Sequence, residues 1–333
     1  MKKDKLIIIG AGLSGLYSAY LLQDRFHITI LEARDRIGGR ILTIEDHDMG
    51  PSWVWSHQRN ILDLTKELEL ELFVQHTQGL ALYDTPKGIE SFTAQAQPPS
   101  ARIVGGLSKL VKALYQKLDL SSVKLNEAVT HLEDSGDGVI VKTQKSSYSA
   151  SKVILTIPPR LAAESITYRP ALTKDIQDKM LLTPTWMGHS AKCVIEYKEA
   201  FWRQEGLSGF VFSPLGPLSE VHDACTKNNA ALFGFIHTQA PRDNIKDLII
   251  KQLLRLFGEK ALNYTNIHII DWKNDPLTAT KDDAKGLSSH PSYGMDISYF
   301  EEKLLFGGTE LSFKEGGYLE GALNKAVQIV QKL

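Results

Sequence analysis

The sequence predicts an α/β fold, and three patterns near its beginning carry this prediction. An apolar run of strand length at 6–9 leads into a glycine-rich segment at 10–15, and a helix-like segment follows at 16–22. A second apolar strand at 28–31 ends on Glu32, close to the roughly 20-residue offset of the acidic residue in dinucleotide-binding βαβ units. Together these patterns are typical of a Rossmann-type domain with a mainly parallel sheet.

The glycine-rich segment has the chemistry of a phosphate site. Gly10 allows the tight turn out of the strand, Gly12 lets the backbone approach a pyrophosphate, and Gly15 permits close packing of the helix on the strand. The N-terminus of the following helix offers free backbone N–H groups and a positive dipole to the phosphates, and Leu13 and Ser14 lie in the same glycine-rich segment. The sequence therefore predicts that the chain binds a dinucleotide.

Residues 32–40 extend this site. Their sequence, Glu-Ala-Arg-Asp-Arg-Ile-Gly-Gly-Arg, supplies a carboxylate for a ribose hydroxyl, and three arginines and two glycines for an anion. These groups fit a dinucleotide, but the residues alone do not separate FAD from NADP. A basic, solvated turn is the simpler alternative for the arginines.

Composition places the chain among ordinary globular proteins. It has 333 residues, of which 43% are hydrophobic and 23% charged, which is enough for two domains and a sizeable core. The formal net charge of −1 provides no general attraction to nucleic acid or to an anionic membrane. The two cysteines, Cys193 and Cys225, favour a reducing compartment, and no window reaches the ~18 apolar residues of a membrane span. We therefore expect a cytoplasmic protein.

Later segments follow the same pattern of strands and amphipathic helices. Apolar residues at helical spacing predict helices from about 58, after Gly105-Gly106, over 243–257 and over 318–333. Strands are expected at 129–132, 139–142, 153–157, 191–197, 210–212, 231–236 and 304–306. The strand at 153–157 is apolar throughout, as a buried parallel strand should be.

Several of these segments resemble one known family, the flavin-containing amine oxidases related to monoamine and polyamine oxidases. Residues 32–40 resemble its E-A-x-x-x-x-G-G-R signature, 104–106 its V-G-G helix start, and 154–159 its strand ending in I-P-P. The most specific match is the C-terminal pair of segments 306–310 and 316–322, which resembles F-A-G-T-E followed by G-Y-x-E-G-A.

The resemblance implies an FAD cofactor and a set of contacts to it. Val129 resembles the residue whose backbone contacts adenine, and Glu310 would bond cofactor hydroxyls. Gly317 would open a helix whose positive end faces the flavin. The predicted cofactor contacts are Gly10, Gly12, Leu13, Ser14, Gly15, Glu32, Ala33, Arg34, Gly39, Arg40, Ser52, Trp53, Val129, Trp272, Gly308, Glu310, Gly317 and Leu319.

Lys192 and Tyr318 are the predicted catalytic residues. The strand around Lys192 resembles the one that brings a lysine to flavin N5 through a water, and its mostly apolar neighbours favour a semi-buried amine over a solvated one. Tyr318 aligns with one of two aromatic residues that form the family's substrate cage. The second aromatic is missing, because Leu277-Thr278-Ala279-Thr280 stands at its place.

The chain departs from the family in two further ways. No cysteine follows Trp272, so flavin attachment should be non-covalent. Only about 60 residues separate Arg40 from Val104, so much of the helical part of the substrate domain is absent and a homodimer or partner subunit could complete the site. We expect a discontinuous FAD-binding domain at 1–77, 102–180 and 276–333, and a reduced α+β substrate domain at 78–101 and 181–275.

These features predict an FAD-dependent amine oxidase. A small-molecule amine would lose hydride from its α carbon to flavin N5, the imine would hydrolyse, and O2 would reoxidise the flavin and give H2O2. Two alternatives stay open: a dehydrogenase or desaturase with a non-oxygen acceptor, and a flavin-binding subunit that needs a partner. Arg169, Arg203 and Arg242 could bind the carboxylate of an amino acid substrate. The histidines are scattered without ligand spacing, so no metal site is predicted, and His290 has a structural role.

Overall fold

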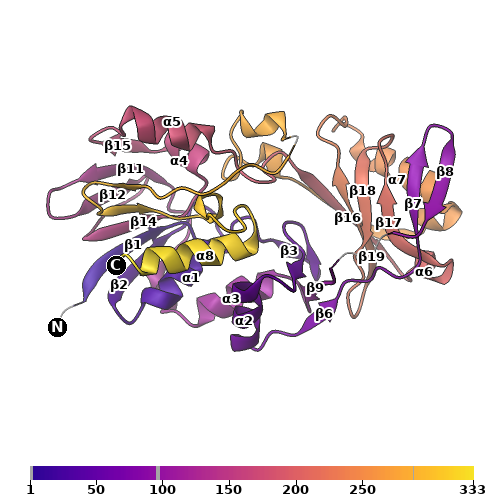
Figure 1. The fold of residues 1–333 in the computed structure, drawn as a ribbon, viewed down its shortest axis with the longest axis horizontal. Helices are drawn as coiled ribbons and strands as arrows, with labels where there is room; N and C mark the ends of the chain where they lie inside the picture. The colour runs from indigo at the N-terminus through magenta and orange to yellow at the C-terminus, as the bar shows by residue number, and fades with distance from the viewer. Residues whose placement is uncertain (1–2, 95–97, 288) are drawn as a thin grey trace.

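The computed structural model describes residues 3–94, 98–287 and 289–333. Two large sheets dominate it, one at each end of an elongated molecule (Figure 1). The six-stranded sheet has the order β10-β2-β1-β14-β22-β21, where the strands are β10 (Val123–Lys124), β2 (Phe26–Leu31), β1 (Asp4–Ile9), β14 (Lys152–Leu155), β22 (Leu304–Phe306) and β21 (Ser298–Tyr299). All its neighbours are parallel except β21, which is an antiparallel edge strand.

Three helices pack together beside this sheet: α1 (Leu13–Leu22), α3 (Ser108–Gln116) and α8 (Leu319–Val330). Helix α8 lies along α1, so the last helix of the chain packs on the first (Figure 1). Helix α2 (Arg59–Glu67) packs on α8 and turns Ile61 and Leu64 into the same core. The parallel strands, the glycine turn and these helices confirm the predicted Rossmann-type α/β fold.

The other face of the six-stranded sheet carries a small α/β unit. It has a four-stranded sheet in the order β13-β12-β11-β15 and two helices, with bounds β13 (Ser147–Ala150), β12 (Val139–Thr143), β11 (Val129–Asp134), β15 (Thr167–Arg169), α4 (Pro159–Ser165) and α5 (Lys174–Leu182). Its apolar side chains form one core with Ile7, Ile9 and Leu155 of the large sheet.

The seven-stranded sheet has the order β20-β16-β19-β18-β17-β7-β8. Its strands are β20 (Tyr264–Asp271), β16 (Ala191–Tyr197), β19 (Ala230–Ile236), β18 (Leu218–Asp223), β17 (Leu207–Phe212), β7 (Leu80–Thr85) and β8 (Gly88–Phe92). Helices α7 (Ile245–Phe257) and α6 (Phe201–Gln204) share its core. Because β7 and β8 come from a separate part of the chain, this sheet combines two segments that the sequence assigned to the substrate domain.

Short elements connect the two large sheets. They are the hairpin β3 (Thr43–Ile44) and β4 (His47–Asp48), and the three-stranded sheet of β5 (Val54–Trp55), β9 (Ser100–Ile103) and β6 (Leu72–Val74). Short 3-10 turns occur at Leu120–Ser122, Glu259–Leu262, Trp272–Asn274, Asp283–Lys285 and Thr309–Leu311. The residue boundaries of the two domains stay a prediction, and residues 95–97 of the predicted segment 78–101 lie outside the described residues.

Some elements differ from those expected from the sequence. The helix after Gly105-Gly106 begins only at Ser108, because both glycines have positive φ angles of 81° and 84° and form a turn. Helix α5 and strands β18 and β20 were not expected, since their sequences lack a clear apolar periodicity. Among the described residues, none of the helices is long and apolar enough to cross a membrane.

Candidate active site

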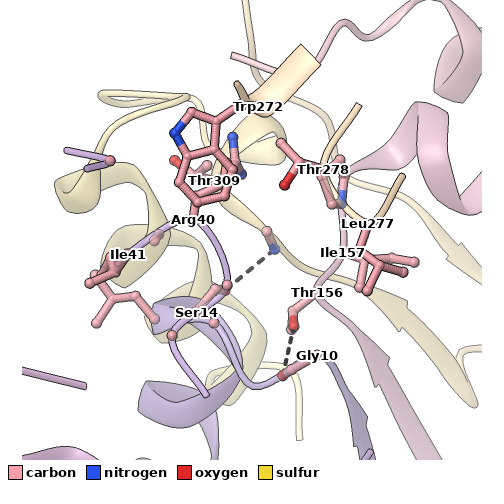
Figure 2. Close-up of a pocket in the computed structure, with 18 of the residues that line it drawn as sticks. Gly10, Ser14, Arg40, Ile41, Thr156, Ile157, Trp272, Leu277, Thr278 and Thr309 are labelled. Atoms are coloured by element: carbon pink, nitrogen blue, oxygen red, sulfur yellow. Dashed lines mark hydrogen bonds between the residues drawn. The ribbon is translucent and has the colours of Figure 1, made fainter. Parts of the chain in front are cut away.

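One cavity of about 620 Å³ is lined by residues from both large sheets. At one end lie Gly10 and Ser14 at the carboxyl end of β1, beside Thr156 after β14 (Figure 2). At the other end lie Lys192 of β16 and Phe233 of β19. Ligands of doubly wound sheets bind at the carboxyl ends of the strands, and the cavity occupies that place.

The glycine fingerprint forms the first end of the cavity. Gly10 has a φ of 103°, which only glycine adopts readily, and a Cβ on Gly15 would lie 2.0 Å from the carbonyl oxygen of Gly10. Gly15 therefore lets α1 rest directly on the turn, although Gly15 itself is not part of the cavity lining. At Gly12, by contrast, no described atom lies within 4 Å of an added Cβ, so this glycine faces open space in the cavity.

The first turn of α1 is arranged to bind an anion. Gly12 is its N-cap, and no side chain of the described residues caps the helix. The N–H groups of Leu13 and Ser14 consequently lack partners within the helix and stand at its positive end. Both residues line the cavity.

Glu32 is held at the end of β2 by two backbone donors. Its carboxylate accepts hydrogen bonds from the N–H of Ala11 at 2.7 Å and from the N–H of Arg34 at 2.9 Å. The side chain is buried but lines the cavity. Because a carboxylate has about four acceptor positions, it retains capacity for a ribose hydroxyl.

The three arginines of the loop have different roles. The Arg34 guanidinium pairs with Asp275 at 2.8 Å and lines the cavity. Arg40 also lines it, and it pairs with Glu310 through two contacts of 2.6 and 3.2 Å. Arg36 instead donates to the carbonyl oxygens of its own loop, including that of Gly39 at 2.9 Å, and so stabilises the turn.

Glu310 differs from the expectation. It is fully buried behind Arg40 with its carboxylate engaged, and it is not among the residues that line the cavity. In the structure Glu310 orients the Arg40 guanidinium, and its direct contact with cofactor hydroxyls stays a prediction.

Lys192 is buried in the wall at the opposite end. Its side chain is 2% exposed, and its Nζ donates to Ser52 Oγ at 2.6 Å and to the carbonyl oxygen of Gly50 at 3.1 Å. The Nζ also lies 4.1 Å from the centre of the Phe233 ring. Burial lowers the pKa of Lys192 to about 7, and the nearby Asp48 carboxylate offsets only part of this effect. Burial therefore makes proton release from this amine easier than from an exposed lysine.

Tyr318 is the N-cap residue of helix α8. Its ring is stacked on His290, with ring centres 5.1 Å apart and planes 3° from parallel. The rings of Trp55 and Trp186 meet it edge-on at 6.1 and 5.9 Å. Gly317, with a φ of 86°, is required here because a Cβ would lie 2.8 Å from the Trp186 side chain.

Aromatic residues that the sequence did not single out as site residues complete this end. Trp55, Trp186, Phe233 and Phe235 line the cavity together with the expected Trp53 and Trp272. Leu277 and Thr278, which the resemblance puts at the position of the second cage aromatic, also line the cavity, and Thr278 Oγ1 accepts a hydrogen bond from Arg34 at 2.9 Å. The two-residue spacing of Phe233 and Phe235 predicts that both side chains lie on the same face of β19. No pattern in the sequence indicates that Trp186 belongs to the site.

A family model described as flavin-containing amine oxidoreductase matches residues 87–333. The chain belongs to this family. A second model, an NAD(P)-binding Rossmann-like domain, matches residues 8–68, which include the glycine fingerprint and Glu32. As a member of the family, the protein is an FAD-dependent amine oxidase.

Individual relatives agree with this family. Canine flavin-containing amine oxidase B is 24% identical over 453 aligned positions, which cover 99% of this chain and 86% of the relative. Canine amine oxidase A is also 24% identical, over 96% of this chain and 82% of its own length. Since this chain has only 333 residues, the relatives carry internal segments that it lacks.

Solved structures share the fold. Cyclohexylamine oxidase from Brevibacterium oxydans superposes with a TM-score of 0.84 at 18% identity, over 99% of both chains. Putrescine oxidase bound to putrescine superposes with a TM-score of 0.82 at 18% identity, over 99% of this chain and 98% of that one.

The cavity of this flavin amine oxidase fits FAD. Two helix N-termini without side-chain caps face it, those of α1 and α8, and the Glu32 carboxylate stands between the glycine turn and Val129. All predicted cofactor contacts except Gly15 and Glu310 line the cavity, and so do Lys192 and Tyr318.

The arginines considered for an amino acid carboxylate lie elsewhere. Arg203 pairs with Asp223 at 2.7 Å and Arg242 with Asp271 at 3.0 Å, while Arg169 is exposed on β15. Within the described part of the chain, none of the three lines the cavity. The cavity therefore gives these residues no role in substrate binding.

Proposed function

We propose that this enzyme oxidises a small primary or secondary amine at the carbon next to nitrogen and passes the electrons to O2, giving H2O2 and, after hydrolysis of the imine, a carbonyl product. The observation that carries this proposal is a single cavity that joins the dinucleotide site to a pocket built by Lys192, Tyr318 and several aromatic rings. Bound FAD supplies the hydride acceptor, N5 of its ring system.

The substrate end favours an amine in its neutral form. Tyr318, Trp55, Trp186 and Phe235 present mainly apolar ring surface, and burying an unpaired ammonium among them would be costly. A neutral amine also has the lone pair that must support loss of hydride from the α carbon. Tyr318 is placed to hold the substrate chain against the cofactor, since His290 fixes its ring by stacking.

Lys192 would assist the reaction with oxygen. A protonated amine beside the flavin stabilises the negative charge that develops on oxygen as it is reduced. Ser52 and Gly50 hold the Nζ in one position by hydrogen bonds. The Nζ also lies over the Phe233 ring, whose face attracts a cation. With a pKa lowered to about 7, the same amine can hold or release a proton in the working pH range.

FAD attachment should be non-covalent. Cys193 and Cys225 are both buried, and no cysteine occurs in the described lining of the cavity. Denaturation should release free FAD, which a covalent link would prevent.

The test is an anaerobic stopped-flow experiment with the holoenzyme. Each member of a panel of aliphatic, aromatic and polyamine substrates is mixed with the oxidised enzyme, and air is added after the flavin absorbance has fallen. Bleaching by one class of amine, rapid recovery in air and one equivalent of H2O2 would support the oxidase. If an amine bleaches the flavin but reduction persists in air, the enzyme is a dehydrogenase with another acceptor.

A further outcome concerns the shortened chain. If no amine bleaches the flavin of the isolated protein, but a preparation with a co-purifying subunit is active, the substrate site is completed by a partner. The mass of the active species then separates a homodimer from a complex with a different subunit.

A further inference from the structure

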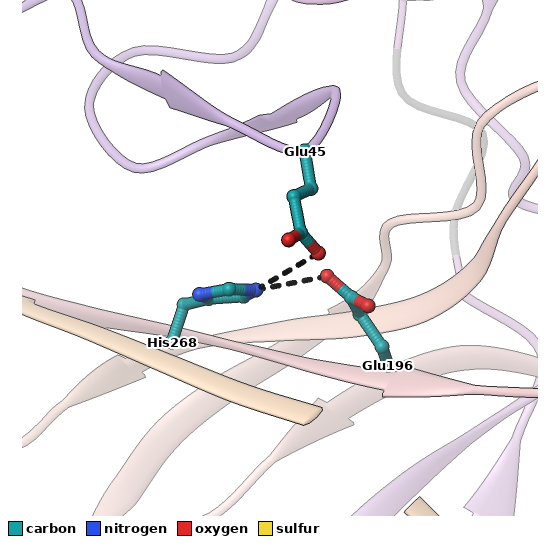
Figure 3. A group of neighbouring side chains, drawn as sticks. All are labelled: Glu45, Glu196 and His268. Atoms are coloured by element: carbon teal, nitrogen blue, oxygen red, sulfur yellow. Dashed lines mark hydrogen bonds and ion pairs between the residues drawn. The ribbon is translucent and has the colours of Figure 1, made fainter. Parts of the chain in front are cut away.

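A group of side chains away from the FAD cavity has the chemistry of a metal site. Glu45, Glu196 and His268 each direct one ligand atom to a common point (Figure 3), and these three atoms lie within 4.8 Å of one another. The Nε2 of His268 lies 2.9 Å from Glu196 Oε1 and 3.7 Å from Glu45 Oε2. Glu45 belongs to the turn of the β3–β4 hairpin, while Glu196 and His268 lie on the neighbouring strands β16 and β20.

A second histidine lies beside this group, next to Glu196. His47 of β4 is fully buried, and its Nε2 lies 3.6 Å from Glu196 Oε1. Neither nitrogen of this ring makes a hydrogen bond within the described part of the chain. A buried imidazole is normally hydrogen-bonded, so the arrangement lacks a partner of some kind.

A simple ion pair explains only part of the group. The 2.9 Å contact accounts for His268 and Glu196, and Asn266 lies 3.2 Å from the same His268 nitrogen. It does not account for His47, nor for the second carboxylate of Glu45 beside an imidazole that Glu196 already neutralises.

We propose that Glu45, Glu196 and His268 bind one Zn²⁺ ion, beside the buried His47. Bonds of about 2.0–2.2 Å to nitrogen and carboxylate oxygen place the ligand atoms of a tetrahedral zinc about 3.4 Å apart, and the separations of 2.9 and 3.7 Å from His268 Nε2 to the two carboxylates lie around that value. One imidazole with two carboxylates suits Zn²⁺ better than Mg²⁺ or Ca²⁺, which prefer six or more oxygen ligands.

The ion would tie the β3–β4 hairpin to the edge of the seven-stranded sheet. The hairpin continues directly into the segment in which Met49 accepts a hydrogen bond from the Trp272 indole at 3.0 Å. Gly50 and Ser52 of the same segment hold the Lys192 amine. Zinc at this place therefore has a structural role, since it fixes the strand and the loop that position Lys192 without entering the cavity.

The test is titration of the FAD-loaded enzyme with ZnCl2, followed by calorimetry and by metal analysis after gel filtration. We expect one Zn²⁺ per chain, a higher unfolding temperature with zinc, and no such effect with MgCl2. Glu45→Gln changes a largely exposed residue that the fold does not need, and it should weaken zinc binding at least tenfold. His268→Gln should abolish retention of the ion, whereas the exposed control His27→Gln should bind as the parent does.

Two results would overturn the proposal. One is the absence of stoichiometric binding to the parent enzyme. The other is equal affinity in the parent, Glu45→Gln and His268→Gln, which would place any bound zinc elsewhere. X-ray absorption of the zinc-loaded enzyme then checks the ligand set, because a spectrum without an imidazole would exclude His268. None of these readouts depends on amine oxidase activity, and Glu45→Gln remains informative if His268→Gln does not fold.

Discussion

The two ends of the FAD cavity are lined by different kinds of chemical group. The end near Gly10 and Glu32 is built around the backbone of the glycine turn and the first turn of α1, where Gly15 occupies a position at which a Cβ would collide. The end near Lys192 and Tyr318 consists of side chains that come from strands and loops far apart in the sequence. A backbone site is specified by local conformation, whereas a side-chain site depends on how whole sheets are placed, so the two ends should respond differently to mutation.

The largest expected effect concerns the glycines of the first end. Gly15→Ala puts a Cβ 2.0 Å from the Gly10 carbonyl oxygen, so α1 must move, at a cost of about 3 kcal/mol. Gly12→Ala meets no described atom within 4 Å and should fold normally, yet its methyl group enters the cavity where the cofactor lies. Chemical unfolding and FAD titration of both variants separate the effects. Normal FAD affinity of Gly12→Ala would contradict the placement of the pyrophosphate.

At the second end, Lys192→Met should act on the reaction with oxygen. Loss of a preorganised charge at a reacting centre typically costs ~100-fold, and we expect that decrease in the rate of flavin reoxidation. Reduction by the amine should change less than threefold, about 0.6 kcal/mol, because Lys192 is held by Ser52 and Gly50 in the wall. Double-mixing stopped-flow measures the two rates separately. An equal loss in both would indicate that Lys192 binds substrate instead.

Glu32→Gln should have a smaller effect, on FAD affinity, at the end of the cavity near Gly10. The amide can still accept from the N–H of Ala11 or Arg34, but the charge-assisted bond to a ribose hydroxyl is lost. We expect FAD affinity to fall about tenfold, or ~1.4 kcal/mol, with unchanged kcat at saturating FAD. Glu127→Gln offers a matched control on the same cavity. An equal loss in both variants would show that charge alone, and not the position of Glu32, matters.

A further prediction concerns the contribution of Lys192 to the pH dependence of stability. Its folded pKa of about 7 lies below the ordinary value of 10.5, so the unfolded chain binds more protons between these pH values. The free energy of unfolding should therefore rise from about pH 7 to 10.5, and the burial penalty is fully present below pH 7. In FAD-free protein, the advantage of Lys192→Met over the parent in unfolding temperature should shrink across this range. A constant difference would contradict the lowered pKa.

The sequence was most informative where function depends on local backbone. The glycine fingerprint, Glu32 and the strand at Ala191–Tyr197 with its buried lysine could all be predicted, because each has a short-range pattern. Phe235 and Trp186 could not be assigned to the site, since ordinary core packing produces the same residue types at the same spacing.

The sequence also did not predict which charged residues pair with one another. The three arginines of one loop looked alike in the sequence, but Arg36 bonds to its own loop and Arg40 is held by a glutamate 270 positions away. The histidines show the same limit, because His47 and His268 have no ligand spacing in the sequence, and each lies within 4 Å of Glu196 only when the sheet has formed and the hairpin lies on it. Long-range partners of this kind cannot be deduced from one sequence without the fold.

The pairing of Arg40 with Glu310 also bears on how the enzyme matures. A ribosome releases the N-terminal segment long before the residues that complete its cofactor site, and α8 is the last helix to emerge and must still pack on α1, the first. Nascent chains should therefore carry an open glycine turn that holds FAD poorly. Loading of the flavin becomes a late, post-translational event, and supply of FAD at that moment decides how much of the newly made protein reaches its stable form.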